Sequence, residues 1–361
     1  MKRLIDYIRS NPISLLLIAI PLTIAANIGK FGIIWLFIFS ALGVIPLASY
    51  IGQATEVIAH RLGPRLGGWL NATLGNAAEL IITIVAIRQG LLELVKASIT
   101  GSILGNLLLV LGMSMLLGGI RHGEQTFDRR SASRNAILLV LSVLILLIPS
   151  LLSHYIGEVE PHPSIRVEAL SLGVSGVMMG LYIMGLIYSF KSSKAPLAHV
   201  KMEEPTTMPS WSPRTSLIIL GVSTFGIVYL SETFVATVEP IIAHLGISEF
   251  FIGIIFIPLI GNVAEHLVAV KVAIKDNMSL SVEICVASSL QIALFVAPVL
   301  VFISLFMNNP LTLIFNQFEL LALIAGVLIT ALVSEDGESN WLEGLELLAI
   351  YAVLGLAFFL L

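Results

Sequence analysis

The sequence predicts an all-α polytopic membrane protein with eleven transmembrane helices. Of its 361 residues 57% are hydrophobic and only 12% are charged, and the mean hydropathy is +0.99. Soluble domains carry about 25% charged residues. The apolar residues also gather in long segments, and two groups of these segments carry matching motifs. The lipid bilayer is therefore the expected surroundings of most of the chain.

Each apolar segment approaches the roughly 20 residues that a helix needs to cross a bilayer. A backbone in lipid must satisfy its own hydrogen bonds, which predicts helices, and the segments lack the alternating polarity of barrel strands. The first segment is interpreted as a span and not a signal peptide, because many others follow it. The predicted spans are 12–29, 32–58, 68–88, 94–118, 133–152, 167–190, 215–238, 247–272, 280–306, 317–333 and 342–360.

The positive charges predict the orientation. With the N-terminus in the cytoplasm, fifteen of the 19 Lys and Arg residues fall on the cytoplasmic side, and only Lys30, Arg88, Lys96 and Arg166 fall outside. This is the bias of natural membrane proteins. The odd number of helices then puts the C-terminus outside. Short loops favour a cell membrane over a vacuole. The net charge of −4 gives no reason to expect nucleic acid, and the single Cys285 excludes an internal disulfide.

The chain divides into two similar halves. A Pro-rich polar stretch without apolar periodicity predicts a cytoplasmic linker over 191–214. It separates a first five-helix repeat at 31–190 from a second at 215–361, and residues 1–30 form an extra N-terminal helix. Five is odd, so the second repeat enters the membrane from the opposite side. This is the inverted-repeat architecture of many transporters.

Three matched features occur in the same order in both halves. The strongest is Gly75-Asn76-Ala-Ala-Glu79, which matches Gly261-Asn262-Val-Ala-Glu265. The three named residues of each motif share one helix face. A carboxylate inside a membrane helix is costly unless it is paired, coordinated or protonated. Glu79 and Glu265 are therefore the main candidates for an intramembrane cation site, with Asn76, Asn262, Gly75 and Gly261 as further candidate ligands through amide or backbone oxygens.

The chemistry of these motifs suits a hard cation. Two carboxylates with amide, hydroxyl and backbone oxygens resemble the six to eight oxygen ligands of Ca²⁺. Glycine weakens a helix, and Pro258 makes a local opening more plausible in the second half. No Cys/His set has zinc spacing. Burial and a neighbouring like charge both favour protonation of a carboxyl group, so Ca²⁺ and protons should displace each other here.

Other polar residues have weaker assignments. The second matched feature, a small-polar stretch in each half, predicts cavity-lining roles for Ser102, Asn106, Ser288, Ser289 and Gln291. Supporting the ligands is favoured over direct ligation for these five residues. For Asn76 and Asn262, hydrogen bonding between helices is an equal alternative.

The third feature pairs Glu56 with Glu239. Both residues, and Glu283, are candidates for a gate or proton path, or interfacial residues at helix ends. His266 is interpreted as an ordinary helix-end residue. The acidic stretch 335–343 is expected to be a solvated cytoplasmic turn and does not fit an EF-hand loop.

Together, these motifs resemble the Ca²⁺/H⁺ antiporter (cation/proton exchanger) family of the Ca²⁺:cation antiporter superfamily. The resemblance also rests on Glu283-Ile-x-Val-Ala-Ser-Ser-Leu-Gln291-Ile-Ala and Asp336-Gly-Glu-Ser-Asn-Trp-Leu-Glu343-Gly, and it extends from the second span to the end. It implies eleven helices, and it implies that Glu79 and Glu265 bind Ca²⁺ and protons alternately. The acidic linker helix of many members has only Glu203 and Glu204 as counterparts here.

The sequence thus predicts a secondary active transporter, with Ca²⁺ and H⁺ as transported ions and no permanently bound cofactor. It shows no Gly-x-x-x-x-Gly-Lys-Ser/Thr nucleotide motif. A Na⁺/Ca²⁺-type exchanger of the same superfamily and, behind it, a cation channel are the alternatives. An intramembrane hydrolase is disfavoured because no nucleophile–base pair is visible, so no enzyme is predicted. The sequence is compatible with a homo-oligomer.

Overall fold

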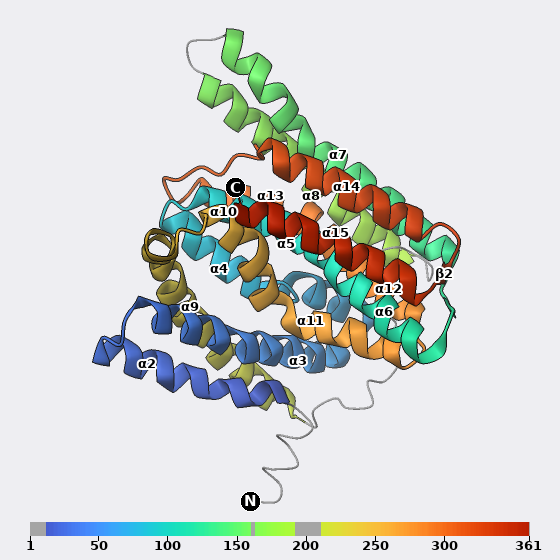
Figure 1. The fold of residues 1–361 in the computed structure, drawn as a ribbon, viewed down its shortest axis with the longest axis horizontal. Helices are drawn as coiled ribbons and strands as arrows, with labels where there is room; N and C mark the ends of the chain where they lie inside the picture. The colour runs from blue at the N-terminus through green and yellow to red at the C-terminus, as the bar shows by residue number, and fades with distance from the viewer. Residues whose placement is uncertain (1–11, 160–162, 192–210, 361) are drawn as a thin grey trace, which may run out of the picture.

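The computed structural model describes residues 12–159, 163–191 and 211–360, and these are almost entirely helical (Figure 1). Within them, nine helices are long and apolar enough to cross a membrane. The linker predicted at 191–214 lies largely outside the described residues, and so do Glu203 and Glu204. The chain is therefore a multi-pass membrane protein.

The elements before the linker begin with a short 3₁₀ turn that leads into the first helix. In chain order they are η1 (Pro12–Ile18), α2 (Ala19–Gly29), α3 (Ile33–Leu74), α4 (Ala77–Arg88), α5 (Leu92–Leu104), η2 (Gly105–Val110), α6 (Leu111–His122), β1 (Gln125–Thr126), α7 (Arg129–Val159) and α8 (Pro163–Lys191).

The elements after the linker begin at Pro213, whose fixed φ suits the first turn of a helix. They are α9 (Pro213–Leu245), α10 (Glu249–Phe251), η3 (Ile252–Phe256), α11 (Ile257–Ile274), α12 (Met278–Gln291), η4 (Ile292–Val296), α13 (Ala297–Ser304), α14 (Gln317–Val333), β2 (Glu338–Ser339) and α15 (Trp341–Leu360).

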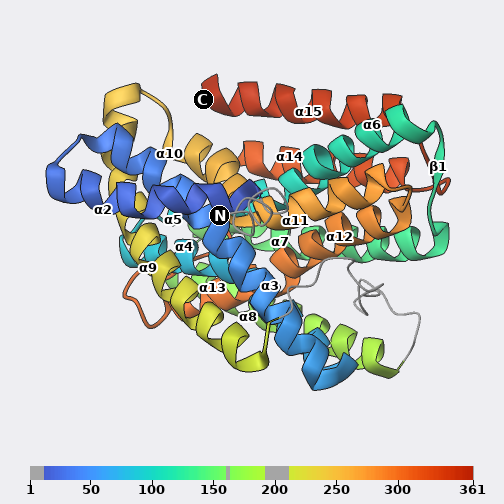
Figure 2. The same ribbon diagram turned by 90° about the horizontal axis from the view of Figure 1, so that it is seen from below.

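Helix α3, which follows the N-terminal helix, packs against α9, the first helix after the linker. This contact is more extensive than that of any other pair of described elements. Figure 2 shows α2 on the left of the view, where it packs against α3, while α15 lies beside α6 along the top. In Figure 1, α11 lies between α3 and α6 and contacts both. The helix that carries the second Gly-Asn-x-Ala-Glu motif is therefore central in the bundle.

The predicted continuous span at 68–88 is wrong. α3 bends at Gly63, where φ is +81°, and ends at Leu74, whereas α4 begins at Ala77. Gly75 and Asn76 form a turn between them. Glycine and asparagine both weaken a helix, but the same pair at Gly261 and Asn262 stays helical in α11, so packing around the first pair also contributes to the turn. The span predicted at 317–333 is the apolar helix α14, which has 17 residues.

The expected opening near Pro258 is also wrong, because α11 continues without interruption through Gly261 and Asn262. The disturbance lies one turn earlier, in the π-helical segment η3, which ends two residues before Pro258. The π-helical η4 ends two residues before Pro298 in the same way. Proline lacks an N–H and its ring meets the carbonyl four residues back, and a π turn accommodates both defects.

The acidic stretch at 335–343 is more ordered than a solvated turn. Its Glu338–Ser339 strand pairs antiparallel with Gln125–Thr126, and Phe127 N donates to Gly337 O at 2.9 Å. Gln125 is buried, and its Nε2 also donates to Ala273 O at 3.0 Å. Three connections, α6–α7, α11–α12 and α14–α15, are thereby joined at one end of the bundle.

The bundle contains a close crossing of helices from the two halves at Gly101 of α5. A Cβ atom at this position would overlap the backbone carbonyl of Ile254 in η3, so only glycine fits. Gly101→Val should therefore force α5 and η3 apart and strongly destabilise the protein. Thermal unfolding of the purified variant in detergent should show a clearly lower midpoint. Gly105→Ala is the control, because nothing lies within 4 Å of its Cβ position; equal midpoints for both variants would contradict the prediction.

Candidate functional site

The two matching motifs meet inside the bundle, where α4 contacts α11. Glu79 lies in the first turn of α4 and is only 2% exposed, and Glu265 lies partly buried in the middle of α11. The Cβ position of Gly261 is 2.7 Å from Glu79 Cγ, and that of Gly75 is 3.5 Å from Glu265 Oε1. Each motif glycine therefore lies against the carboxylate of the other half.

Glu79 is held through one of its two carboxylate oxygens. Ser102 Oγ donates a short hydrogen bond to Oε1, and Asn262 Nδ2 donates to the same Oε1 at 2.5 Å. Its other oxygen, Oε2, is buried and has no hydrogen-bond partner among the described residues. One oxygen is thus occupied by donors, and the other is available to a ligand.

Glu265 has the corresponding support in the second half. Ser288 Oγ donates to Glu265 Oε2 at 2.7 Å. The serine follows the glutamate by 23 residues in both pairs, Glu79 with Ser102 and Glu265 with Ser288. Two cavity-lining candidates thus contact the predicted carboxylates directly, and the contact is repeated in the two halves.

Asn76 contacts Gln291, another predicted residue, across the two halves. Asn76 Nδ2 donates to Gln291 Oε1 at 2.9 Å. The side-chain carbonyl oxygen of Asn76, Oδ1, is buried and has no hydrogen-bond partner within the described ranges. The site therefore holds two buried, unpartnered oxygens, on Glu79 and on Asn76.

Other predicted residues stay apart from the carboxylates. Ser289 Oγ donates to Cys285 O on its own helix at 2.9 Å. Glu56 is partly buried on α3 and Glu239 is exposed near the end of α9, and neither hydrogen-bonds Glu79 or Glu265. Glu283 is partly buried on α12.

Sequence reasoning missed the environment of His266. Its Nε2 lies 3.2 Å from Asn106 Oδ1 in η2, so the ring is part of the polar interior and not an ordinary helix-end residue. The missed signal is its position directly after Glu265. No role was predicted for Glu319, which is fully buried. Its side chain and that of Asn316 each accept a hydrogen bond from the other residue's backbone N–H, which forms a capping box at the start of α14. The pattern Asn-x-x-Glu before an apolar segment could have predicted this capping box.

The donor set of this site suits a hard cation. No group of three or more His, Cys, Asp or Glu side chains gathers anywhere in the described part of the chain, so the ligands would be a carboxylate pair completed by neutral oxygens. Carboxylates, amide carbonyls and hydroxyls are ligands of Ca²⁺ and similar ions. Zinc prefers nitrogen and sulfur ligands, whereas the two glutamates and the serines and amides bonded to them offer oxygen.

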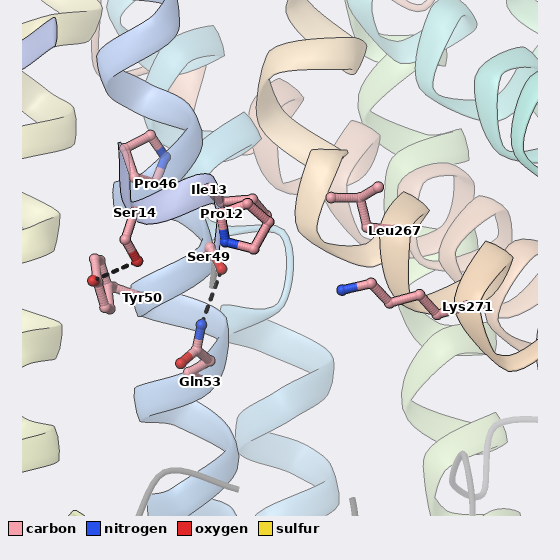
Figure 3. A pocket seen from close by; sticks show the side chains of 9 residues that line it. All are labelled: Pro12, Ile13, Ser14, Pro46, Ser49, Tyr50, Gln53, Leu267 and Lys271. Atoms are coloured by element: carbon pink, nitrogen blue, oxygen red, sulfur yellow. Dashed lines mark hydrogen bonds between the residues drawn. The ribbon is translucent and has the colours of Figure 1, made fainter. Parts of the chain in front are cut away.

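A small cavity of about 40 Å³ lies between η1, α3 and α11 (Figure 3). Gln53 on α3 donates to Ser49 at its wall, and Lys271 on α11 points toward it from the opposite side. None of the predicted site residues lines this cavity. The carboxylate pair is thus separate from this cavity.

Fold and site together define a polytopic membrane protein with two carboxylates, one from each half, that meet inside the helix bundle. The family model described as "sodium/calcium exchanger protein" matches residues 32–191 and 215–360. The chain belongs to this family, and the family resemblance seen in the sequence is confirmed.

Three relatives show how far the similarity extends. The chain is 42% identical to a Ca²⁺/H⁺ antiporter of Synechocystis sp., over 97% of this chain and 98% of that protein. It is 39% identical to the Ca²⁺/H⁺ antiporter ChaA of Bacillus subtilis, over 97% and 100%. The solved structure of native YfkE matches with a TM-score of 0.83 and 37% identity, over 97% of this chain and 100% of that one.

Proposed function

We propose that this chain is a secondary transporter that exchanges Ca²⁺ for H⁺ across a membrane, with Glu79 and Glu265 as the shared site. The observation that carries the proposal is the reciprocal contact between each carboxylate and the motif glycine of the other half. The relatives named Ca²⁺/H⁺ antiporters support the choice of ions.

The ligands of Ca²⁺ would be the carboxylates and the free oxygens around them. Glu79 Oε2 and Asn76 Oδ1 are buried and lack hydrogen-bond partners in the described part of the chain, so each can turn a lone pair toward a cation. Glu265 supplies the second carboxylate. Two negative charges match a divalent ion, because they neutralise it in a place where unpaired charge is costly.

Protons would use the same two carboxylates. In the absence of a cation, two buried carboxylates near each other favour protonation, since this removes both the burial cost and the repulsion. Binding of Ca²⁺ releases the protons, and returning protons displace Ca²⁺. The two ions exclude each other from one site, so their opposite gradients are coupled without any nucleotide.

Access to the site would alternate between the two sides of the membrane. The proposed framework has eleven helices: an extra helix at 1–30, repeats at 31–190 and 215–361 of inverted topology, and the linker 191–214. Support comes from the family model, which matches two separate stretches on either side of the linker. The equal glutamate-to-serine separations in both halves support it as well.

The proposed location is a cell membrane, with the N-terminus in the cytoplasm and the C-terminus outside. The support is the distribution of Lys and Arg over the loops. With this orientation the β1–β2 ladder, which joins three connections, lies on the cytoplasmic side. A channel is disfavoured, since the named relatives are antiporters.

Sodium is the one alternative counter-ion that a specific observation favours, because the description of the matching family model names sodium. The ion gradient that drives uptake distinguishes a sodium-coupled from a proton-coupled exchanger. If sodium drives exchange, Ca²⁺ uptake will need a Na⁺ gradient. If protons drive it, uptake will proceed in Na⁺-free medium.

The deciding experiment is uptake of ⁴⁵Ca²⁺ into proteoliposomes with an acidic interior and no sodium. We expect accumulation that collapses when ammonium dissipates the pH gradient, because outward protons are exchanged for inward Ca²⁺. Na⁺, Mg²⁺ and Mn²⁺ are then added as competitors. Uptake that ignores the pH gradient but follows a Na⁺ gradient would replace the proton with sodium in the proposal.

A further inference from the structure

The two halves differ at one position beside the site. Residues of the first half match those 186 positions later: Asn76 matches Asn262, and Ser102 matches Ser288. The same spacing matches Gly105 with Gln291. Gly105 is the first residue of the π-helical segment η2, and Gln291 directly precedes the π-helical segment η4, so the two residues occupy closely similar places in the fold. One half thus has a long amide side chain where the other has none.

The two equivalent asparagines behave differently in the structure. Asn262 Nδ2 donates to the carboxylate of Glu79 at 2.5 Å. Asn76 Nδ2 does not repeat this contact with Glu265 and donates instead to Gln291 Oε1 at 2.9 Å. The pseudo-symmetry of the site is therefore broken at the amides, although it is kept at the glutamates and serines.

The residues at 105 and 291 explain this difference. An amide side chain has one NH₂ end that donates and one oxygen that accepts, so a bond made by one end fixes the direction of the other. Gln291 accepts from the NH₂ end of Asn76, which leaves Asn76 Oδ1 buried and unpartnered. At Gly105 no side chain exists, and nothing lies within 4 Å of its Cβ position, so Asn262 has no amide acceptor there and donates to Glu79.

From these contacts we propose that Gln291 is a positioning residue: by accepting from Asn76 Nδ2, it turns the Asn76 carbonyl oxygen toward the transported cation. This rests on the proposed function of the Glu79–Glu265 site. The two asparagines then have different roles. Asn76 presents a neutral oxygen to the cation, whereas Asn262 is a donor that orients Glu79.

The test replaces Gln291 and measures the Ca²⁺ concentration that gives half-maximal uptake driven by a pH gradient. In Gln291→Leu the NH₂ end of Asn76 loses its acceptor, and we expect this concentration to rise about 10-fold or more, as for groups that orient a metal ligand. The maximal rate should change less. Gln291→Glu keeps an acceptor oxygen and should return the value to that of the wild type or below. Ser289→Ala is the matched control, since its hydroxyl bonds only to its own helix.

A second background keeps the test decisive even if Gln291→Leu folds poorly. In Asn76→Asp the side chain ends in two equivalent oxygens, so no acceptor is needed to orient it. Gln291→Leu should therefore cost much less in Asn76→Asp than in the wild type. An equal cost in both backgrounds, or Gln291→Glu as weak as Gln291→Leu, would overturn the assignment.

Failure of this inference differs from failure of the proposed function. If Gln291→Leu keeps the wild-type half-saturating concentration while Glu79→Gln is inactive, the site stands and the positioning role falls. If Glu79→Gln and Glu265→Gln both transport Ca²⁺ normally, the site itself is wrong, and the positioning role falls with it.

Discussion

Glu79→Gln and Glu265→Gln should each reduce Ca²⁺ uptake driven by a pH gradient by about 100-fold or more, which exceeds the 10–100-fold cost of removing a group behind a metal ligand. Glutamine keeps the size of the side chain but removes one of two charges that face the cation. It also cannot take up or release a proton. Both halves of the exchange are thus lost together, and binding of Ca²⁺ to the purified protein should weaken in parallel.

The matched control is Glu232→Gln. Glu232 is a partly exposed carboxylate of α9 that pairs with Arg88 at 2.7 Å, and such pairs contribute only about 0–1 kcal/mol. Its uptake should stay close to that of the wild type. Uptake of ⁴⁵Ca²⁺ is measured at equal amounts of reconstituted protein. If either site variant transports at the control's rate, that glutamate is not a ligand and the shared site is wrong.

Gly261→Ala should inactivate transport almost as completely, although it adds one methyl group. The added Cβ would lie 2.7 Å from Glu79 Cγ, which is closer than carbon atoms approach in proteins. Either Glu79 or α11 must then move. Glu79 is held by Ser102 and Asn262, so its displacement breaks hydrogen bonds in a buried place. The expected result is a large loss of Ca²⁺ uptake with the fold retained.

Gly105→Ala separates this effect from a general intolerance of alanine. Gly105 is also a buried glycine of a membrane helix, but its Cβ position is open for 4 Å. Its uptake and its unfolding midpoint should both match the wild type. Normal uptake by Gly261→Ala would show that the close approach of α11 to Glu79 is not needed for transport.

The sequence was sufficient to predict which residues the two motifs bring together, because the repeat places the same residue types twice. Glu79, Glu265, Ser102 and Ser288 were found from motifs of fixed spacing, and the structure brings these four together. Ser289, a further residue predicted to line the cavity, is not part of this group of hydrogen bonds. It differs from Ser288 by about 100° around the helix, and its hydroxyl bonds to the preceding turn.

The cross-half contacts could not be predicted in the same way. Asn76 and Gln291 are 215 residues apart, and Asn106 and His266 are 160 apart. Helical periodicity indicates which residues share a face, but not which face of another helix they meet. The π-helical segments add a further shift, since one extra residue in a turn rotates every side chain that follows it. Pro258 made a helix opening more plausible in the second half, but the opening occurs at Gly75 and Asn76 in the first, although the same Gly-Asn pair is present in both.

The hydrogen bond between Asn262 and Glu79 has a consequence for biosynthesis. The two residues are 183 positions apart, so at about 5–20 residues per second the ribosome adds the amide roughly 10–40 s after the carboxylate. Ser102 arrives only 23 residues after Glu79 and is the earlier donor. During translation Ser102 is therefore available to Glu79 before Asn262 is, and the chain can complete this carboxylate's hydrogen bonds only after the second half has been synthesised.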